Sequence, residues 1–231
     1  MLQSVPPRIT FLSILKDNWI FTLFFCLWLI AGGLLLALSE HGEWVLYFNA
    51  NRTPFWNLFF KYGTQFAEEY IFISLILLLA LFVRFRMAIA FTFMALATLV
   101  VSATAKQIFR HPRPLRYFTE LGTNDELTFI EGVRVNVGLS SFPSGHTLAA
   151  FAIYGFLAFN AGHKKISGVA FFAMALMVGI SRIYLVQHFL EDIYLGSVLG
   201  VLLAAYFFLL QQKIGEKPWL DRNLLNLRKS G

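Results

Sequence analysis

Residues Ser181–Asp192 read SRIYLVQHFLED and stand between two nearly pure hydrocarbon stretches, Phe171–Ile180 before them and Ile193–Leu210 after them. The stretch carries an arginine, a histidine and an aspartate. Titratable groups set between two apolar spans are costly to keep beside a bilayer, so they are expected to serve a function. The sequence therefore predicts two membrane helices joined by a segment that carries chemistry.

The composition places the whole chain in a membrane. Of its 231 residues, 58% are hydrophobic and only 14% are charged, compared with roughly 25% charged residues in soluble domains. Apolar runs of about 20 residues recur along the chain, which is typical of membrane helices. We therefore expect an all-α fold, a six-transmembrane-helix bundle that forms a single domain over residues 1–231.

Charge and cysteine content exclude other classes. The net charge of +6 would suggest a nucleic-acid partner in a soluble protein, but in a membrane protein it indicates Lys and Arg gathered on the cytoplasmic side. The single cysteine, Cys26, lies in the first apolar run. This excludes an intrachain disulfide framework and zinc sites built on cysteine.

Six spans are predicted after a polar, cytoplasmic leader over residues 1–17. They cover about residues 19–38, 69–85, 87–109, 143–160, 166–185 and 189–210. A long polar loop, residues 110–142, joins the third and fourth spans, and loops of this length are more often functional than idle.

An amphipathic helix is expected between the first two spans. Pro54 is well placed to open it, and aromatic residues then recur at spacings of three and four: Phe55, Trp56, Phe59, Phe60 and Phe66. This pattern favours a helix that lies in the membrane interface. A helix that packs on the soluble side is the alternative.

The distribution of charge predicts the orientation. Six spans put both termini on one side of the membrane. That side carries eleven basic residues, including Arg8, Arg228 and Lys229, and three acidic residues, including Glu216, so its net charge is +8. The other side holds eight basic and ten acidic residues, a net −2. Positive charge stays inside, so the termini are expected in the cytoplasm and the functional segments at the outer face, periplasmic or extracellular in a bacterium and lumenal in a eukaryote.

Two further segments fall at that outer face. Lys106–Pro114 reads KQIFRHPRP, and its Lys106 and Arg113 could be mere interface anchors. The sequence FPSGHT opens the fourth span, where Ser144 can cap the helix and free amide groups behind Ser144 and Gly145 can bind an anion. His146 lies in the first turn of that helix.

His188 and Asp192 are four residues apart at the start of the sixth span, so they share a helix face. The carboxylate can accept a hydrogen bond from one ring nitrogen and leave the other facing a site. Alone, this could be a structural pair. Arg182, at the end of the fifth span, can reach the same place.

Together these groups suit phosphoryl transfer. Arg and Lys with backbone amides bind phosphate. An Asp-oriented histidine can act as nucleophile or base, and a second histidine as the acid for the leaving oxygen. Phosphoryl transfer needs positioning and charge stabilisation above all.

The chain resembles the type 2 phosphatidic acid phosphatase superfamily of integral membrane lipid phosphatases, which includes bacterial phosphatidylglycerophosphate and undecaprenyl-diphosphate phosphatases. The family signature K-x6-R-P, P-S-G-H and S-R-x5-H-x3-D stands here as Lys106–Pro114, Pro143–His146 and Ser181–Asp192, in order and without a departure. Gly196 and Gly200 form a G-x-x-x-G, which could mark a dimer seam or packing inside the bundle.

The resemblance implies a role for each matched residue. His188 would attack phosphorus and form a phosphohistidine, Asp192 would orient it, and His146 would protonate the leaving lipid oxygen and then activate water. The phosphoryl oxygens would be held by Lys106, Arg113, Ser144, Gly145 and Arg182. The implied partners are a lipid phosphate and the bilayer, with no metal and no cofactor.

Three alternatives stay open. A zinc site could use His146, His188, Asp192 and Glu131, although the neighbouring cations would repel a metal. A lipid-phosphate binding or transport protein could use the anion site without chemistry. A phosphotransferase could pass the phosphate to an acceptor other than water.

The substrate is not fixed by the motifs. The family offers undecaprenyl diphosphate, phosphatidylglycerol phosphate, phosphatidic acid and the phosphates of lipid A. Residues 41–68 and 115–140 are expected to choose among them. Arg110, Arg116 and Arg134 could meet a second phosphate or could be solvated loop charges. A bacterial inner membrane is the expected location, and the oligomeric state is not predicted.

Overall fold

The computed structural model describes residues 10–214 and 217–227, which contain helices and no strand, as the predicted all-α class requires. The elements are α1 (Phe11–Asp17), α2 (Trp19–Leu38), α3 (Glu43–Ala50), α4 (Pro54–Gly63), η1 (Thr64–Ala67), α5 (Glu69–Leu78), η2 (Leu79–Val83), α6 (Phe85–Phe109), α7 (Pro114–Glu120), η3 (Asn124–Glu126), α8 (Gly145–Asn160), α9 (Lys164–Tyr184), α10 (Leu190–Lys213) and α11 (Leu224–Leu227). Four residues named in the charge distribution lie outside the described ranges: Arg8, Glu216, Arg228 and Lys229.

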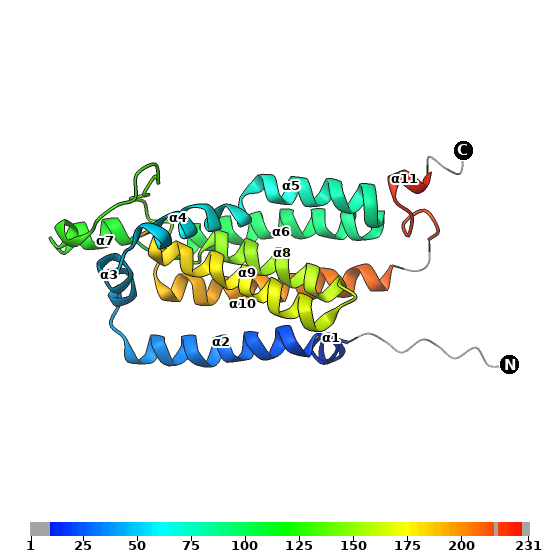
Figure 1. Cartoon of the computed structure of the whole chain (residues 1–231), viewed down its shortest axis with the longest axis horizontal. Coiled ribbons are helices and arrows are strands. Elements are labelled where there is room, and N and C mark those ends of the chain that lie inside the picture. The colour runs from blue at the N-terminus through cyan, green and yellow to red at the C-terminus, as the bar shows by residue number, and fades with distance from the viewer. Residues whose placement is uncertain (1–9, 215–216, 228–231) are drawn as a thin grey trace.

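The long helices α2, α5, α6, α8, α9 and α10 lie side by side along the long axis of the molecule (Figure 1). Helices α3, α4 and α7 gather at one end, and α1 and α11 lie at the other. The functional segments before α7, α8 and α10 therefore meet at the end that carries α3, α4 and α7.

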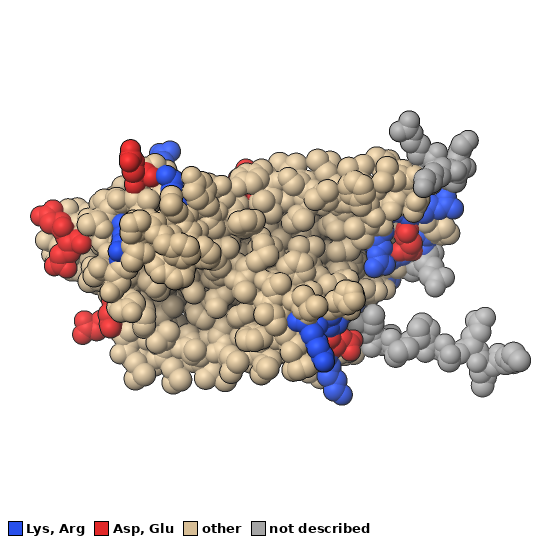
Figure 2. Space-filling model, viewed as in Figure 1, with Lys and Arg blue, Asp and Glu red and all other residues tan. Residues whose placement is uncertain are grey.

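Several helices are suited to cross a bilayer. Within residues 10–214 and 217–227, four are long and apolar enough to do so alone: α2, the stretch Phe85–Glu120 that begins with α6, α9 and α10. A fifth span results if Pro54–Ala67 and Glu69–Val83, which meet at a bend of 55°, count as one. In Figure 2 the charged side chains gather toward the two ends, and a broad band between them is almost free of charge. The chain is an integral membrane protein.

Helix α8 forms the centre of the bundle. It is apolar on nearly every side, and such a helix is expected to be buried. Twelve of its 16 residues are buried, and it packs against α6, α9 and α10. At 16 residues it is shorter than the roughly 20 that a straight span needs. Its first turn is nevertheless held at the end of the bundle where the functional segments meet.

The G-x-x-x-G of α10 serves packing inside the bundle. A Cβ atom at Gly200 would lie 2.6 Å from the carbonyl oxygen of Leu148, and one at Gly196 would lie 2.9 Å from that of Ser144. Both contacts are too short for a side chain, so the two glycines let α10 approach α8 closely. The packing interpretation of this motif is confirmed, and this approach places the start of α10 beside the start of α8.

The region between the first two spans contains one predicted helix and one unpredicted helix. α4 begins at Pro54, as predicted, and Thr53 caps it by accepting from the backbone N–H of Trp56. Phe60 is buried against Tyr184, with ring centroids 4.6 Å apart, whereas Phe55 is exposed. α3 was not predicted, because a helix of eight residues is too short to show a clear period.

Residues 110–142 are more ordered than a plain loop. They contain α7 and η3 and are tied to α3 by reciprocal bonds between Asn49 and the backbone of Thr128, both 2.9 Å long. Arg52 also donates to the carbonyl oxygen of Thr128, and to that of Tyr184 at 2.8 Å. The segment is therefore a fixed cover over the end of the bundle.

Candidate active site

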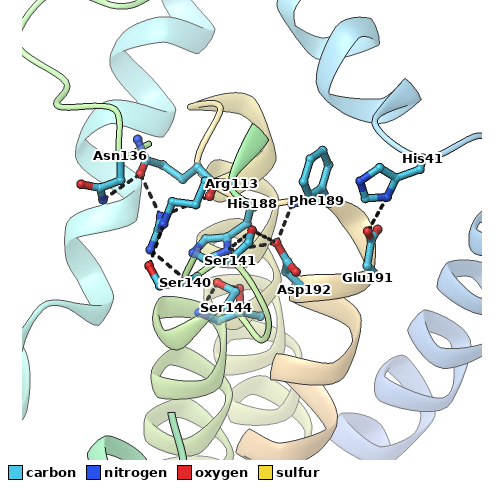
Figure 3. A network of polar contacts seen from close by, with 12 residues as sticks. His41, Arg113, Asn136, Ser140, Ser141, Ser144, His188, Phe189, Glu191 and Asp192 are labelled. Carbon is cyan, nitrogen blue, oxygen red and sulfur yellow. Dashed lines mark hydrogen bonds and ion pairs between the residues drawn. The ribbon is translucent and has the colours of Figure 1, made fainter. Parts of the chain in front are cut away.

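The three motif segments come together at one end of the bundle (Figure 3). Arg113 precedes α7 as its N-cap, Ser144 precedes α8 as its N-cap, and His188 lies two residues before α10. The sequence predicted His188 at the start of the sixth helix, whereas that helix begins at Leu190 with Phe189 as its N-cap. The predicted convergence of the segments is confirmed, and it depends on the close packing of α8 against α10.

His188 and Asp192 form the predicted pair. Nδ1 of His188 lies 3.1 Å from Oδ2 of Asp192, which also accepts from the backbone N–H of Phe189 at 2.9 Å and from the hydroxyl of Ser141. His188 and Asp192 are each only 1% exposed. Because the carboxylate contacts Nδ1, the ring nitrogen left available to a ligand is Nε2.

His188 stands among cations. Burial, followed by the nearby charges of Arg113 and Arg182, lowers the pKa of His188 well below its ordinary value. The ring is therefore neutral at physiological pH, and a neutral imidazole has a lone pair that can act as a nucleophile or a base.

Arg113 is held in place by neutral oxygens. Its guanidinium donates to the hydroxyl and the carbonyl oxygen of Ser140, both at 3.3 Å, and to the carbonyl and side-chain oxygens of Gln187 at 3.2 and 3.3 Å. The side chain of Asn136 donates to the same Gln187 oxygen at 3.4 Å. These partners orient Arg113 without neutralising it, so its charge stays available to an anion.

Arg182 is also buried, and its hydrogen-bond partner is a neutral group. It is 7% exposed and donates from Nη1 to the hydroxyl of Thr64 at 2.7 Å. Its Nε has no hydrogen-bond partner in the described part of the chain. A buried guanidinium with an unsatisfied donor is suited to receive an anion.

The start of α8 lies beside a third cation of the site, Lys106. A Cβ atom at Gly145 would lie 2.9 Å from the Ser102 hydroxyl and 3.3 Å from Nζ of Lys106. A larger residue would therefore displace the lysine. The hydroxyl of Ser144 accepts from the backbone N–H of Thr147 at 3.3 Å, as predicted for a cap. The backbone N–H of Ser144 donates to the carbonyl oxygen of Asp192 at 3.0 Å, so this amide is not free to bind an anion.

His146 has a partner that the sequence did not predict. Its Nε2 lies 3.0 Å from Oε1 of Glu68, which stands at the junction of η1 and α5. The two histidines of the site are therefore paired with different carboxylates. Glu68 is missing from the three motifs, and the only signal for it in the sequence is an acidic residue at the edge of an apolar span.

The other unpredicted residues are Ser141, Gln187 and Thr64. Ser141 and Gln187 are direct or near neighbours of motif residues along the chain, and this adjacency is the signal that was available. Thr64 comes from η1, far from the motif of Arg182, and no local pattern points to it. Only the packing of η1 on α9 brings the two together.

A groove leads from this site along the bundle. Its volume is about 430 Å³, within the range of small-molecule sites. Glu68, Lys106 and His146 border one part of it, and most of its other lining residues are apolar side chains of α5 and α6, among them Phe72, Ile73, Ile76, Ala95, Leu96 and Leu99. Along α6 the lining runs from Thr92 to Lys106, about 21 Å at 1.5 Å per residue.

The loop arginines differ from one another. Arg116 is paired with Glu120 at 2.7 Å, which favours the interpretation as a solvated loop charge for that residue. Arg110 and Arg134 are exposed. Among the described residues, no group of three or more His, Cys, Asp or Glu is arranged to hold a metal ion, so the four residues of the zinc alternative do not form such a cluster.

Comparison with known proteins agrees with this geometry. Residues 86–216, more than half of the chain, match the PAP2 superfamily. The chain belongs to the PAP2 superfamily. The predicted resemblance is thereby confirmed, and the match includes all three motif segments.

Curated relatives align over shorter stretches. Phosphatidylglycerophosphatase B of Bacillus subtilis (strain 168) is 40% identical over 79 residues, which is 31% of this chain and 37% of the relative. Bacitracin transport permease protein BcrC of Bacillus licheniformis is 46% identical over 69 residues, 30% of this chain and 32% of the relative. Lipid phosphate phosphatase 1 of Arabidopsis thaliana is 31% identical over 136 residues, 50% of this chain and 42% of the relative. The alignments span less than half of each of these relatives.

Two solved structures share the fold. The crystal structure of Aquifex aeolicus LpxE has a TM-score of 0.62 at 23% identity and covers 74% of this chain and 96% of that one. A transmembrane PAP2 type phosphatidylglycerolphosphate phosphatase from Bacillus subtilis has a TM-score of 0.53 at 24% identity and covers 86% and 98%. At these identities the likeness is one of fold.

Proposed function

We propose that this chain is a membrane lipid phosphatase that removes the terminal phosphate from a phospholipid or an isoprenoid (di)phosphate. One observation carries the proposal: the buried, neutral His188 is oriented by Asp192 and stands among cations whose hydrogen-bond partners are neutral. A nucleophile beside guanidinium groups that form no salt bridge within the described residues is suited to attack a phosphoryl group.

The reaction proceeds in two steps. Nε2 of His188 attacks phosphorus while the bond between phosphorus and the lipid oxygen breaks, and His146 gives its proton to that leaving oxygen. Asp192 stabilises the positive charge that develops on the His188 ring. Water then attacks the phosphohistidine, His146 takes a proton from the water, and phosphate leaves as the bond between phosphorus and nitrogen breaks. Both histidines return to their starting states.

The cradle for the phosphoryl oxygens consists of Lys106, Arg113, Arg182, the N-cap Ser144 and the backbone N–H of Gly145. The three cations supply the charge that Mg²⁺ supplies in other phosphoryl-transfer enzymes, so the proposal includes no metal. The Ser144 hydroxyl already accepts from Thr147, and it can still donate its own proton to a phosphoryl oxygen.

The groove between α5 and α6 takes the hydrocarbon tail of the substrate. Its polar part borders His146 and Lys106, and its remainder is apolar. A lipid with its phosphate at His188 and its tail between these helices would match this change in polarity. Phosphatidylglycerol phosphate is the first candidate to test, because relatives carry the name of its phosphatase. Undecaprenyl diphosphate, phosphatidic acid and lipid A phosphate follow.

We place the chain in a bacterial inner membrane, as one domain with α8 as a short sixth span and both termini in the cytoplasm. The site then opens at the periplasmic or extracellular face. The charge asymmetry of the sequence supports this orientation. The exposed aromatic face of α4 lies in the interface of the same leaflet, as Phe55 and Trp56 suggest.

A panel of lipid phosphates, incubated with the purified protein in detergent and in excess chelator, tests this function. Release of inorganic phosphate is the expected result. Phosphate that appears on another acceptor in place of water would favour a phosphotransferase, and binding without release would favour a transport or binding protein. Loss of activity in chelator would favour a metal hydrolase.

A further inference from the structure

Glu68 is a carboxylate of the site that none of the three sequence motifs contains. Its Oε1 lies 3.0 Å from Nε2 of His146, and both residues border the groove. Their side chains are 41% and 29% exposed. The pair is therefore open to the groove, and an incoming lipid phosphate can reach it.

The backbone that carries Glu68 is held beside the site by two other helices. Tyr154 of α8 donates to the carbonyl oxygen of Phe66 at 2.8 Å, and Arg182 of α9 donates to the hydroxyl of Thr64 at 2.7 Å. Both anchors lie within four residues of Glu68. The carboxylate is therefore presented at a defined position rather than on a free loop.

Cations dominate the other surroundings of His146. Lys106 and Arg182 are close enough for their charges to act on the ring. The titratable and charged groups that face it, element by element, are Glu68 before α5, Glu69 of α5, Lys106 of α6, Arg182 of α9 and His188 before α10. The two cations oppose a further positive charge on the ring, whereas a carboxylate in hydrogen-bond contact stabilises it.

We propose that Glu68 is a positioning residue that stabilises the protonated form of His146, the form that acts as the general acid. The inference rests on the proposed function, in which His146 protonates the leaving oxygen. In the protonated form, the Nε2–H of His146 donates to Glu68. With substrate, this N–H turns to the leaving lipid oxygen and gives up its proton as the bond between phosphorus and that oxygen breaks. The proton taken later from water restores the ion pair.

The pH profile of kcat/KM separates this role from a structural one. In Glu68→Gln the acid loses its proton at lower pH, so we expect the alkaline limb of the profile to move down by about one pH unit. The loss of activity relative to wild type should then be about tenfold greater on the alkaline side than on the acidic side. Glu68→Asp should restore part of the shift, and the exposed Glu126→Gln should leave the limb where it is.

Two results would overturn the inference. An equal loss of activity at every pH would mean that Glu68 only supports the fold. A gain of activity at every pH in Glu68→Gln would mean that the carboxylate merely repels the substrate.

A second measurement does not depend on turnover. The titration of the His146 ring can be followed by NMR of ¹⁵N-labelled histidine, with the signal assigned by its absence in His146→Ala. We expect the ring to lose its proton at lower pH in Glu68→Gln than in wild type. An unchanged titration would overturn the inference even if the enzyme is active. A wild-type chain that releases no phosphate would instead contradict the proposed function, and the NMR comparison would still decide whether Glu68 holds the proton on His146.

Discussion

Ser141 donates its hydroxyl to Oδ2 of Asp192 from a position 51 residues upstream in the chain. The same hydroxyl lies 3.4 Å from Nδ1 of His188, so it adjoins both members of the pair. Within the described residues, the three hydrogen-bond contacts of the Asp192 side chain are all on Oδ2, and Oδ1 has no partner. Ser141 therefore helps to set the angle at which the carboxylate meets the histidine.

Ser141→Ala should slow the chemical step while substrate binding persists. A hydrogen bond to a charged group contributes about 1.5 kcal/mol or more, and about 1.4 kcal/mol corresponds to a tenfold change in rate. We expect kcat to fall about tenfold with little change in KM. Ser167→Ala, near the end of α9 that is remote from the site, is the matched control. A raised KM with unchanged kcat would show that Ser141 acts on binding instead.

Ala95→Phe should narrow the groove between α5 and α6. Ala95 lines this groove, whereas Ala103, also on α6, is exposed and does not line it. We expect Ala95→Phe to lower the ratio of kcat/KM on a long-chain lipid phosphate to that on a short-chain one, and Ala103→Phe to keep the wild-type ratio. Equal ratios in the two variants would place the lipid tail elsewhere.

Gly200→Ala should destabilise the bundle. The added Cβ atom would lie 2.6 Å from both the carbonyl oxygen of Leu148 and Cβ of Phe151. Overpacking of this kind costs typically about 1–3 kcal/mol. Thermal unfolding in detergent should therefore begin at a lower temperature than in wild type. Gly162→Ala has open space around it and should unfold like wild type, and a similar midpoint in both variants would argue against the close approach of α10 to α8.

The stability of the protein is expected to depend on pH through His41. Its Nδ1 lies 2.7 Å from Oε1 of Glu191, and this hydrogen bond is the main cause that raises the pKa of His41, against partial burial. The folded-state pKa of His41 lies above the ordinary value of about 6.5. The contribution of the His41–Glu191 pair to the free energy of unfolding is therefore fully present below that value and is lost as the pH rises through the raised pKa.

The comparison of wild type with Glu191→Gln measures this contribution. The wild-type thermal midpoint should exceed that of the variant by most at about pH 5.5, and the difference should shrink by about pH 8.5. A difference that does not vary with pH would mean that the pair acts by packing, through the rings of Phe189 and Tyr117 that adjoin His41.

Much of the fold could be predicted because the bilayer imposes a simple pattern on sequence. The apolar runs gave helix bounds close to those observed, and Trp19–Leu38 agrees at both ends. The short helices α3 and α7 were missed, since one or two turns leave no readable period. For α7, Pro114 is a helix-opening residue, but the surrounding polar sequence concealed it.

The relations within the site that could be predicted are those between residues close together in the sequence. His188 and Asp192 are four residues apart, and Ser144 directly precedes a helix, so each relation follows from one stretch of chain. Glu68 meets His146 across 78 residues, and that contact depends on the bend between Ala67 and Glu69. Sequence spacing carries no information about such a contact.

In the proposed mechanism, His188 becomes phosphorylated during turnover. It is tested most directly by incubating the protein with a lipid phosphate carrying ³²P in its terminal phosphate, quenching within the first turnover, and measuring label on the chain. We predict label on wild type that is stable in alkali and lost in acid, as for a phosphohistidine, and no label or phosphate release with His188→Ala. Equal labelling of the variant, or continued release of phosphate by it, would rule out His188 as the nucleophile.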